Sequence, residues 1–115
     1  DETGEGVGEG FTINYPLPPG TSVATWMAAL DEALARIHQA ECELLVVSLG
    51  VDIFEDDPIS AFTFQHADFI ALGQRLAAAG LPCVFLMEGG YAVEDIGVNV
   101  VNVLQGFEEV TQGVK

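Results

Sequence analysis

The sequence predicts an α/β fold in which a parallel sheet lies between flanking helices, as in a three-layer arrangement. Two observations carry this prediction. Short apolar runs typical of buried strands alternate with segments whose apolar residues recur every three or four positions, as on one face of a helix. The resulting order, βαβαβα, is typical of parallel strands joined by crossover helices. The chain has 115 residues, of which 50% are apolar and 18% charged, so it can bury one core and is not a disordered chain.

The N-terminal segment is predicted to be a flexible Gly/Glu-rich loop over residues 1–10, followed by a strand. Every second residue from Gly4 to Gly10 is glycine, which disfavours a helix. The segment lacks the spacing and the flanking elements of a dinucleotide-binding fingerprint. Large apolar and polar residues then alternate from Phe11 to Tyr15, and three prolines follow at once. Because proline removes a ladder donor, we expect a first short strand that ends there.

The first helix is expected from Val23 to Gln39, because Gly20-Thr21-Ser22 offers a start and a stripe of apolar residues follows at helical spacing. A second strand follows at 44–49. This continuous apolar run, closed by Gly50, is typical of a strand covered on both faces of a parallel sheet.

Three more elements complete the predicted order. Thr63 is a candidate cap for a second helix through about Ala79, and a third strand follows over 83–87. Apolar residues at helical spacing predict a third helix that starts near Val93 and ends near Gly106. Three strands and three helices are few neighbours for doubly covered strands, so we expect an open sheet edge.

Charge and cysteine content exclude several classes of function. Eighteen acidic residues face three basic ones, and the formal net charge is −15. Nucleic acids and anionic membranes are therefore unexpected partners, whereas a cationic ligand or a metal ion suits this charge. No apolar run approaches the roughly 20 residues of a membrane span, and the acidic N-terminus does not resemble a secretory signal, so we expect a cytoplasmic protein. Cys42 and Cys83 are expected to be reduced and packed in the core, with a disulfide or metal role as the alternative.

The candidate chemistry lies where the second and third strands end, because loops at the carboxyl ends of parallel strands share one crevice. Asp52 follows the second strand and can bind a metal ion or simply cap the next segment. Tyr91 follows two glycines after the third strand and can either donate from its hydroxyl or pack half-buried. Residues 55–57 are interpreted as a solvated turn. His38 and His66 lack a second ligand at metal-binding spacing and are expected on the surface.

Three motifs resemble the histone-deacetylase-like family, which has the arginase/deacetylase fold. They are Leu49-Gly50-Val51-Asp52, Asp57-Pro58-Ile59-Ser60 and Met87-Glu88-Gly89-Gly90-Tyr91. Within this family the likeness to bacterial acetylpolyamine amidohydrolases is closest, because a glutamate, Glu88, stands where histone deacetylases proper have a run of glycines. The likeness extends over nearly the whole chain and corresponds to the C-terminal third of such an enzyme. Residues 1–115 are therefore interpreted as a single C-terminal segment.

The resemblance implies zinc-dependent hydrolysis of an amide, with N-acetylated polyamines or another acylamide as substrate. It implies that Asp52 is one of three zinc ligands and that Tyr91 hydrogen-bonds the carbonyl oxygen as it becomes an oxyanion. Glu88, Gly89 and Gly90 would line the substrate channel.

The family's other zinc ligands come from an Asp-x-His motif, and its general base comes from a pair of adjacent histidines. Neither motif occurs in this sequence. Three protein ligands are the rule for catalytic zinc, so we expect the isolated chain to be inactive. The alternative is a βαβ module without catalytic chemistry that binds partners or self-associates through its exposed sheet edge.

Overall fold

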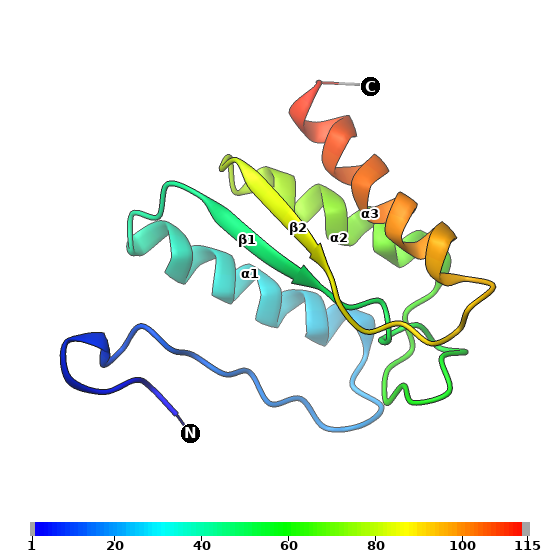
Figure 1. Cartoon of the computed structure of the whole chain (residues 1–115), viewed down its shortest axis with the longest axis horizontal. Coiled ribbons are helices and arrows are strands. Elements are labelled where there is room, and N and C mark those ends of the chain that lie inside the picture. The colour runs from blue at the N-terminus through cyan, green and yellow to red at the C-terminus, as the bar shows by residue number, and fades with distance from the viewer. Residues whose placement is uncertain (1, 114–115) are drawn as a thin grey trace.

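The structure is a computed structural model that describes residues 2–113. Its elements, in chain order, are a 3-10 turn η1 (Gly6–Gly8), α1 (Val23–Gln39), β1 (Leu45–Leu49), α2 (His66–Ala78), β2 (Cys83–Met87) and α3 (Ile96–Thr111). The prediction of an α/β fold with a parallel sheet and flanking helices is confirmed (Figure 1).

The sheet consists of β1 and β2, which pair in parallel with Leu45 opposite Cys83 and Leu49 opposite Met87. Pairing continues beyond the strands at their carboxyl ends. The Glu88 N–H donates to the Leu49 carbonyl at 2.9 Å, and the Val51 N–H donates to the Gly89 carbonyl at 2.8 Å. The two chain segments therefore leave the sheet side by side, which sets the position of the two candidate loops.

The expected strand from Phe11 to Tyr15 is wrong. These residues form no strand, and the arm that contains them runs in an extended path along α1, away from the sheet (Figure 1). Alternation of apolar and polar residues becomes a strand only where a neighbouring strand offers its hydrogen bonds, and the sheet of the described residues has two strands. The preceding loop holds the η1 turn and is mostly exposed; its flexibility stays a prediction.

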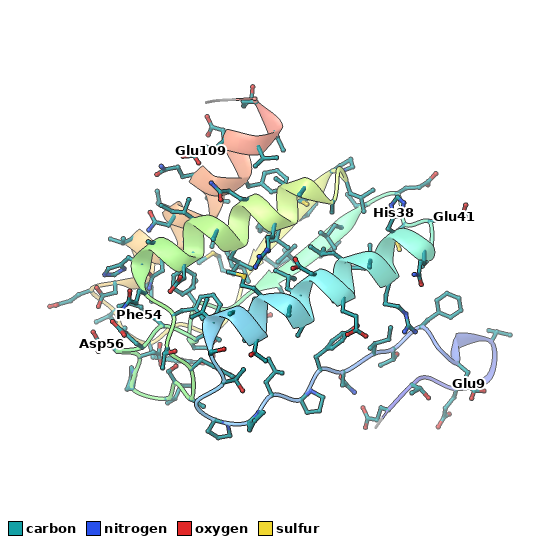
Figure 2. The ribbon with its side chains drawn as sticks, turned by 180° about the vertical axis from the view of Figure 1, so that it is seen from behind. Glu9, His38, Glu41, Phe54, Asp56 and Glu109 are labelled. Carbon is teal, nitrogen blue, oxygen red and sulfur yellow. The ribbon has the colours of Figure 1, made fainter. Side chains whose placement is uncertain are left out.

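One face of the sheet is covered and the other is open. Leu45, Val47 and Leu49 of β1 and Phe85 of β2 join the core cluster with Met27 of α1, Phe69 and Leu72 of α2 and Val103 of α3. Seen from behind, α1 and α2 lie in front of the strands (Figure 2). The alternate residues Val46, Val84 and Leu86 are 54%, 45% and 49% exposed. The expectation that the strands are covered on both faces is therefore not met within this chain, because all its helices pack on one side.

The helix bounds agree with the predictions where local signals set them. The range of α1 is as expected, and the Ser22 hydroxyl accepts the Thr25 N–H at 3.1 Å as its cap. Thr63 does not cap α2. That helix begins after Gln65, whose N–H donates to the Asp68 carboxylate at 2.8 Å.

The third helix begins later and ends later than predicted. Val93 lies before α3 and is 77% exposed, and the helix continues past Gly106 to Thr111. Gly106 belongs to the contact with α2, where a Cβ would collide with the Ile70 backbone carbonyl. Gly73 of α2 lies against the Val103 carbonyl of α3 in the same way. These two glycines let the helix backbones touch, so Gly106 is a packing residue and not a helix stop.

Both cysteines are free thiols, but their environments differ. Cys42 is exposed, so the expectation that it packs in the core is wrong; it follows α1 in a connecting turn and not in a strand. Cys83 opens β2 and is partly buried, and this burial raises the pKa of its thiol. Among the described residues, no helix is both long and apolar enough to cross a membrane.

Candidate functional site

The loops that follow β1 and β2 meet at one rim, as the parallel pairing requires. The carboxylate of Asp52 lies directly over the backbone of the second loop. A Cβ at Gly89 would lie 2.9 Å from Asp52 Cγ and even closer to Oδ2, and a Cβ at Gly50 would lie 2.8 Å from Oδ1. Glycine at both positions thus leaves room for this carboxylate, and any larger side chain would displace it.

The rest of the second loop is also held closely. A Cβ at Gly90 would lie 2.8 Å from Val51 Cγ2 and 3.1 Å from Ile96 Cγ2, so this loop packs between the loop that follows β1 and the start of α3. Glu88 is exposed, and Tyr91 is 51% exposed, so its side chain reaches solvent at the rim. The structure therefore brings Asp52, Gly89 and Tyr91 to one end of the sheet, while their catalytic and channel roles stay predictions.

Asp57 is a buried residue whose role the sequence did not show. Its side chain is 6% exposed, and Oδ2 accepts the Tyr91 N–H at 2.7 Å and the Ala92 N–H at 3.3 Å. Oδ1 accepts the Ile59 N–H at 3.0 Å, which is the local turn expected for residues 55–57. Glu55 and Asp56 are exposed, in agreement with the solvated turn, but Asp57 is buried, so the expectation of a solvated residue is wrong for Asp57. Its burial and its bonds to the second loop distinguish Asp57 from Glu55 and Asp56, and these bonds join residues far apart in the sequence.

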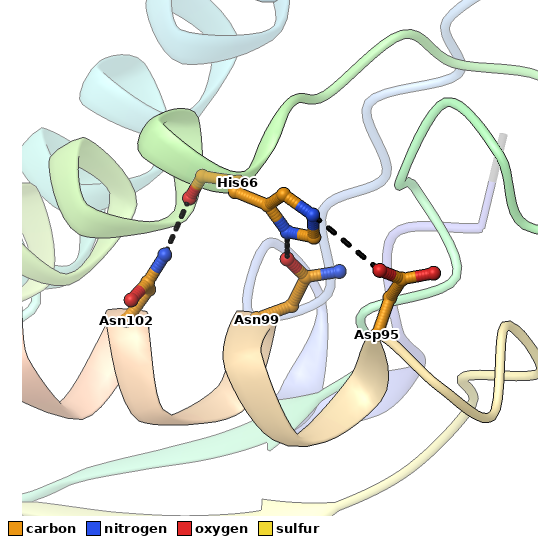
Figure 3. A network of polar contacts seen from close by, with 4 residues as sticks. All are labelled: His66, Asp95, Asn99 and Asn102. Atoms are coloured by element: carbon orange, nitrogen blue, oxygen red, sulfur yellow. Dashed lines mark hydrogen bonds and ion pairs between the residues drawn. The ribbon is translucent and has the colours of Figure 1, made fainter.

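His66 links the same region to the start of α3 (Figure 3). Its Nδ1 lies 2.7 Å from Asn99 Oδ1, and its Nε2 lies 3.4 Å from Asp95 Oδ1. The ring also stacks on Phe54 of the first loop, with 4.7 Å between ring centroids. Asn102 donates to the His66 carbonyl at 2.8 Å. The histidine is half-exposed, as expected for a surface residue. Its side chain also connects α2 to the start of α3 and to the loop that carries Asp52.

Replacing His66 by alanine is expected to lower the free energy of unfolding by about 1–3 kcal/mol. The reason is that Asn99, which is fully buried, loses its partner, and Phe54 loses its stacked ring. Urea denaturation followed by circular dichroism measures this. The control is His38→Ala on the exposed end of α1 (Figure 2), for which we expect a change within about 0.5 kcal/mol. Equal losses of unfolding free energy in both variants would contradict a stabilising role of the His66 contacts.

Asp52 is a candidate metal ligand, but the described residues around it do not form a complete metal site. Across residues 2–113, no group of three His, Cys, Asp or Glu side chains converges so that it could hold a metal ion. Catalytic zinc takes three protein ligands, so Asp52 by itself does not hold one. The two histidines do not supply the missing ligands: His66 is engaged with Asn99 and Asp95, and His38 lies at the opposite end of the molecule from Phe54 (Figure 2).

Comparison with known protein families gives one match across most of the chain. Residues 1–107 match the model of the family described as histone deacetylase domain. The chain is 55% identical over 108 residues to acetylpolyamine amidohydrolase 1 of Pseudomonas aeruginosa and 51% identical over 106 residues to acetylpolyamine amidohydrolase of Mycoplana ramosa. These alignments cover 94% and 92% of this chain.

A solved structure is similar as well. The crystal structure of acetylpolyamine aminohydrolase from Burkholderia pseudomallei superposes with a TM-score of 0.90 at 35% sequence identity, covering 94% of this chain and 32% of that one. The chain likewise spans 31% of the length of each of the two curated relatives. It therefore corresponds to about a third of these proteins.

Proposed function

Because the chain belongs to the histone deacetylase domain family, we propose that it supplies the C-terminal part of the active site of a zinc-dependent amidohydrolase that acts on N-acetylated polyamines. The observation that carries this proposal is the shared rim, where Asp52 and the Gly89-Gly90-Tyr91 loop lie against each other. Close identity to relatives named acetylpolyamine amidohydrolases supports the substrate class.

In this proposal Asp52 is one of the zinc ligands. Its carboxylate is well suited, because zinc accepts carboxylate oxygens and the glycines at 50 and 89 leave room for the carboxylate at the rim. A zinc ion bound there would supply a polarised carbonyl and an activated water. The remaining ligands and the general base would come from protein outside this chain, so the isolated chain is expected to be inactive.

Tyr91 has the role of a hydrogen-bond donor to the substrate. Its half-exposed side chain belongs to the loop whose Gly89 lies against Asp52, and in this proposal the hydroxyl meets the carbonyl oxygen of a bound amide. A donor aimed at an oxygen that gains charge stabilises the transition state more than the ground state. Glu88, Gly89 and Gly90 would line the approach to this position, and the exposed Glu88 carboxylate suits a cationic polyamine.

Acetylated polyamines also suit the charge of the chain, which has a formal net charge of −15. A negative surface raises the local concentration of cationic ligands.

A cytoplasmic location is part of the proposal and is supported by the free thiols of Cys42 and Cys83, which persist in a reducing compartment.

A hybrid enzyme tests the proposed function directly. The matching third of the Pseudomonas aeruginosa relative is replaced by this chain, which is 55% identical to it over 108 residues. We expect the purified hybrid to bind zinc and to release acetate from N-acetylated polyamines, whereas the 115-residue chain alone does neither. If the isolated chain hydrolyses the substrate and Asp52→Asn abolishes this activity, the proposal that the other ligands and the general base come from outside this chain is wrong.

A second candidate function is a non-catalytic module that self-associates. It is favoured by the open sheet face, where Val46, Val84 and Leu86 are all about half exposed. Exposed apolar patches of this kind mark surfaces that other protein covers. A hybrid that folds but neither binds zinc nor hydrolyses the substrate would favour this second function.

A further inference from the structure

We propose that Asp57 is a positioning residue that holds the backbone of Tyr91 in place from the opposite loop. The inference rests on the proposed function of Tyr91 and adds to it the group that fixes the tyrosine. Asp57 follows β1 in the loop that also carries Asp52, whereas Tyr91 follows β2. One carboxylate thus joins the loop of the candidate metal ligand to the loop of the candidate hydrogen-bond donor.

The geometry of the carboxylate divides its two oxygens between the two loops. Oδ1 accepts the N–H of Ile59 in its own loop, which orients the side chain. Oδ2 accepts the N–H groups of Tyr91 and Ala92, 34 and 35 residues away. Two consecutive N–H groups bound to one oxygen fix the direction of the backbone where the Tyr91 side chain leaves it.

Burial makes this contact strong and specific. Asp57 is 6% exposed, and none of the salt bridges among residues 2–113 includes it. A buried carboxylate without a cation is costly unless hydrogen bonds replace its hydration. Three backbone N–H donors do so here, and hydrogen bonds to an ionised acceptor are about twice as strong as neutral ones. The chain therefore places a charge in its interior at the point where the two loops touch.

The neighbouring residue Asp56 shows that burial and contact with the second loop are not shared by the whole acidic run. Asp56 has the same side chain and the next position in the same turn, but it is exposed at the loop surface (Figure 2). A change from Asp to Asn at either position removes the same charge and keeps the volume. The pair Asp57→Asn and Asp56→Asn is thus a matched test and control.

Amide exchange in the 115-residue chain tests the contact without any activity. Asp57→Asn turns one of the two oxygens into an NH2 donor, so either the Ile59 N–H or the N–H groups of Tyr91 and Ala92 lose their acceptor, and the bonds that remain lose the charge of the acceptor. We therefore expect hydrogen exchange at Tyr91 and Ala92 to be about tenfold faster or more. Exchange at the buried residues Leu76 and Val103 should stay unchanged, and Asp56→Asn should change none of them. Unchanged exchange at Tyr91 in a folded Asp57→Asn variant would overturn the proposal.

A measurement on the unsubstituted chain keeps the test valid if Asp57→Asn does not fold. A scalar coupling across the hydrogen bond, between the Tyr91 amide nitrogen and the Asp57 carboxyl carbon, is expected in the NMR spectrum. Its absence, with the Tyr91 amide exchanging as fast as the exposed Glu94 amide, would contradict the contact.

Kinetics of the hybrid enzyme separate positioning from general support of the fold. We expect Asp57→Asn to lower kcat by about tenfold to a hundredfold, because a displacement of a catalytic group by about 1 Å can slow the reaction by up to about a hundredfold. In the Tyr91→Phe background the same change should cost less than about twofold, since Asp57 then has no hydroxyl to position. Equal losses in both backgrounds would show a merely structural role.

The two proposals can fail separately. If the unsubstituted hybrid hydrolyses its substrate and Asp57→Asn leaves kcat unchanged, the positioning role is wrong and the proposed function stands. If the hybrid is inactive, the proposed function fails, and amide exchange in the 115-residue chain still decides whether Asp57 holds Tyr91.

Discussion

Replacing Tyr91 by phenylalanine in the hybrid enzyme is expected to lower kcat by about 10²–10³-fold with KM and zinc content unchanged. The change removes one hydroxyl from a side chain that is 51% exposed at the rim, so it leaves the fold intact. Loss of a single oxyanion donor has this magnitude in other hydrolases, because the donor acts mainly on the charge that develops in the transition state. Steady-state kinetics with an N-acetylated polyamine, together with metal analysis of each protein, measure the effect.

Two variants serve as controls for this result. Tyr15, the other tyrosine of the chain, has a buried hydroxyl without a hydrogen-bond partner among residues 2–113, so Tyr15→Phe should leave kcat unchanged. Asp52→Asn should abolish activity by a different route, with zinc lost from the protein. A Tyr91→Phe hybrid that retains full kcat would remove Tyr91 from the proposed chemistry.

Replacing Gly106 by alanine is expected to destabilise the chain by about 2–3 kcal/mol. The added Cβ would meet the Ile70 carbonyl and lie 3.1 Å from the Gln74 amide nitrogen, so the clash is with the backbone of α2 and not with a movable side chain. The helices would have to separate, and such overpacking costs this much even though alanine favours helix. Gly73→Ala should act in the same way, because its Cβ would meet the Val103 carbonyl.

Gly97 of α3 provides the matched control, since nothing lies within 4 Å of an added Cβ there. Gly97→Ala should raise the free energy of unfolding by up to about 1 kcal/mol through helix propensity alone. Urea denaturation followed by circular dichroism compares the three variants. A Gly106→Ala chain as stable as Gly97→Ala would contradict the close approach of α2 and α3.

The candidate site was predictable from the sequence to the level of two loops and no further. The apolar runs at 44–49 and 83–87 indicated parallel strands, and Asp52 and Tyr91 therefore belonged at one rim. The motifs around them indicated the family, which the comparison confirms. Asp57 looked like part of a turn because its local bond, to Ile59, is indeed that of a turn. Its bonds to Tyr91 and Ala92 have no counterpart in local sequence.

The sequence by itself determined the features that depend on near neighbours in the chain. The bounds of α1 follow from a cap at Ser22, and the strands follow from continuous apolar runs. Such signals involve residues within one helical turn or one strand, so a short stretch of sequence contains them.

Only the tertiary structure decided the features that depend on residues far apart. Phe11 to Tyr15 has the pattern of a strand but no strand beside it, and Gly106 resembles a helix stop but faces the backbone of α2. His66 and Asp57 gain their partners from segments more than 30 residues away. Whether a polar side chain is solvated or joins two loops depends on what the fold brings to it. In this chain Asp56 is exposed to solvent, whereas the adjacent Asp57 is buried and accepts the Tyr91 N–H.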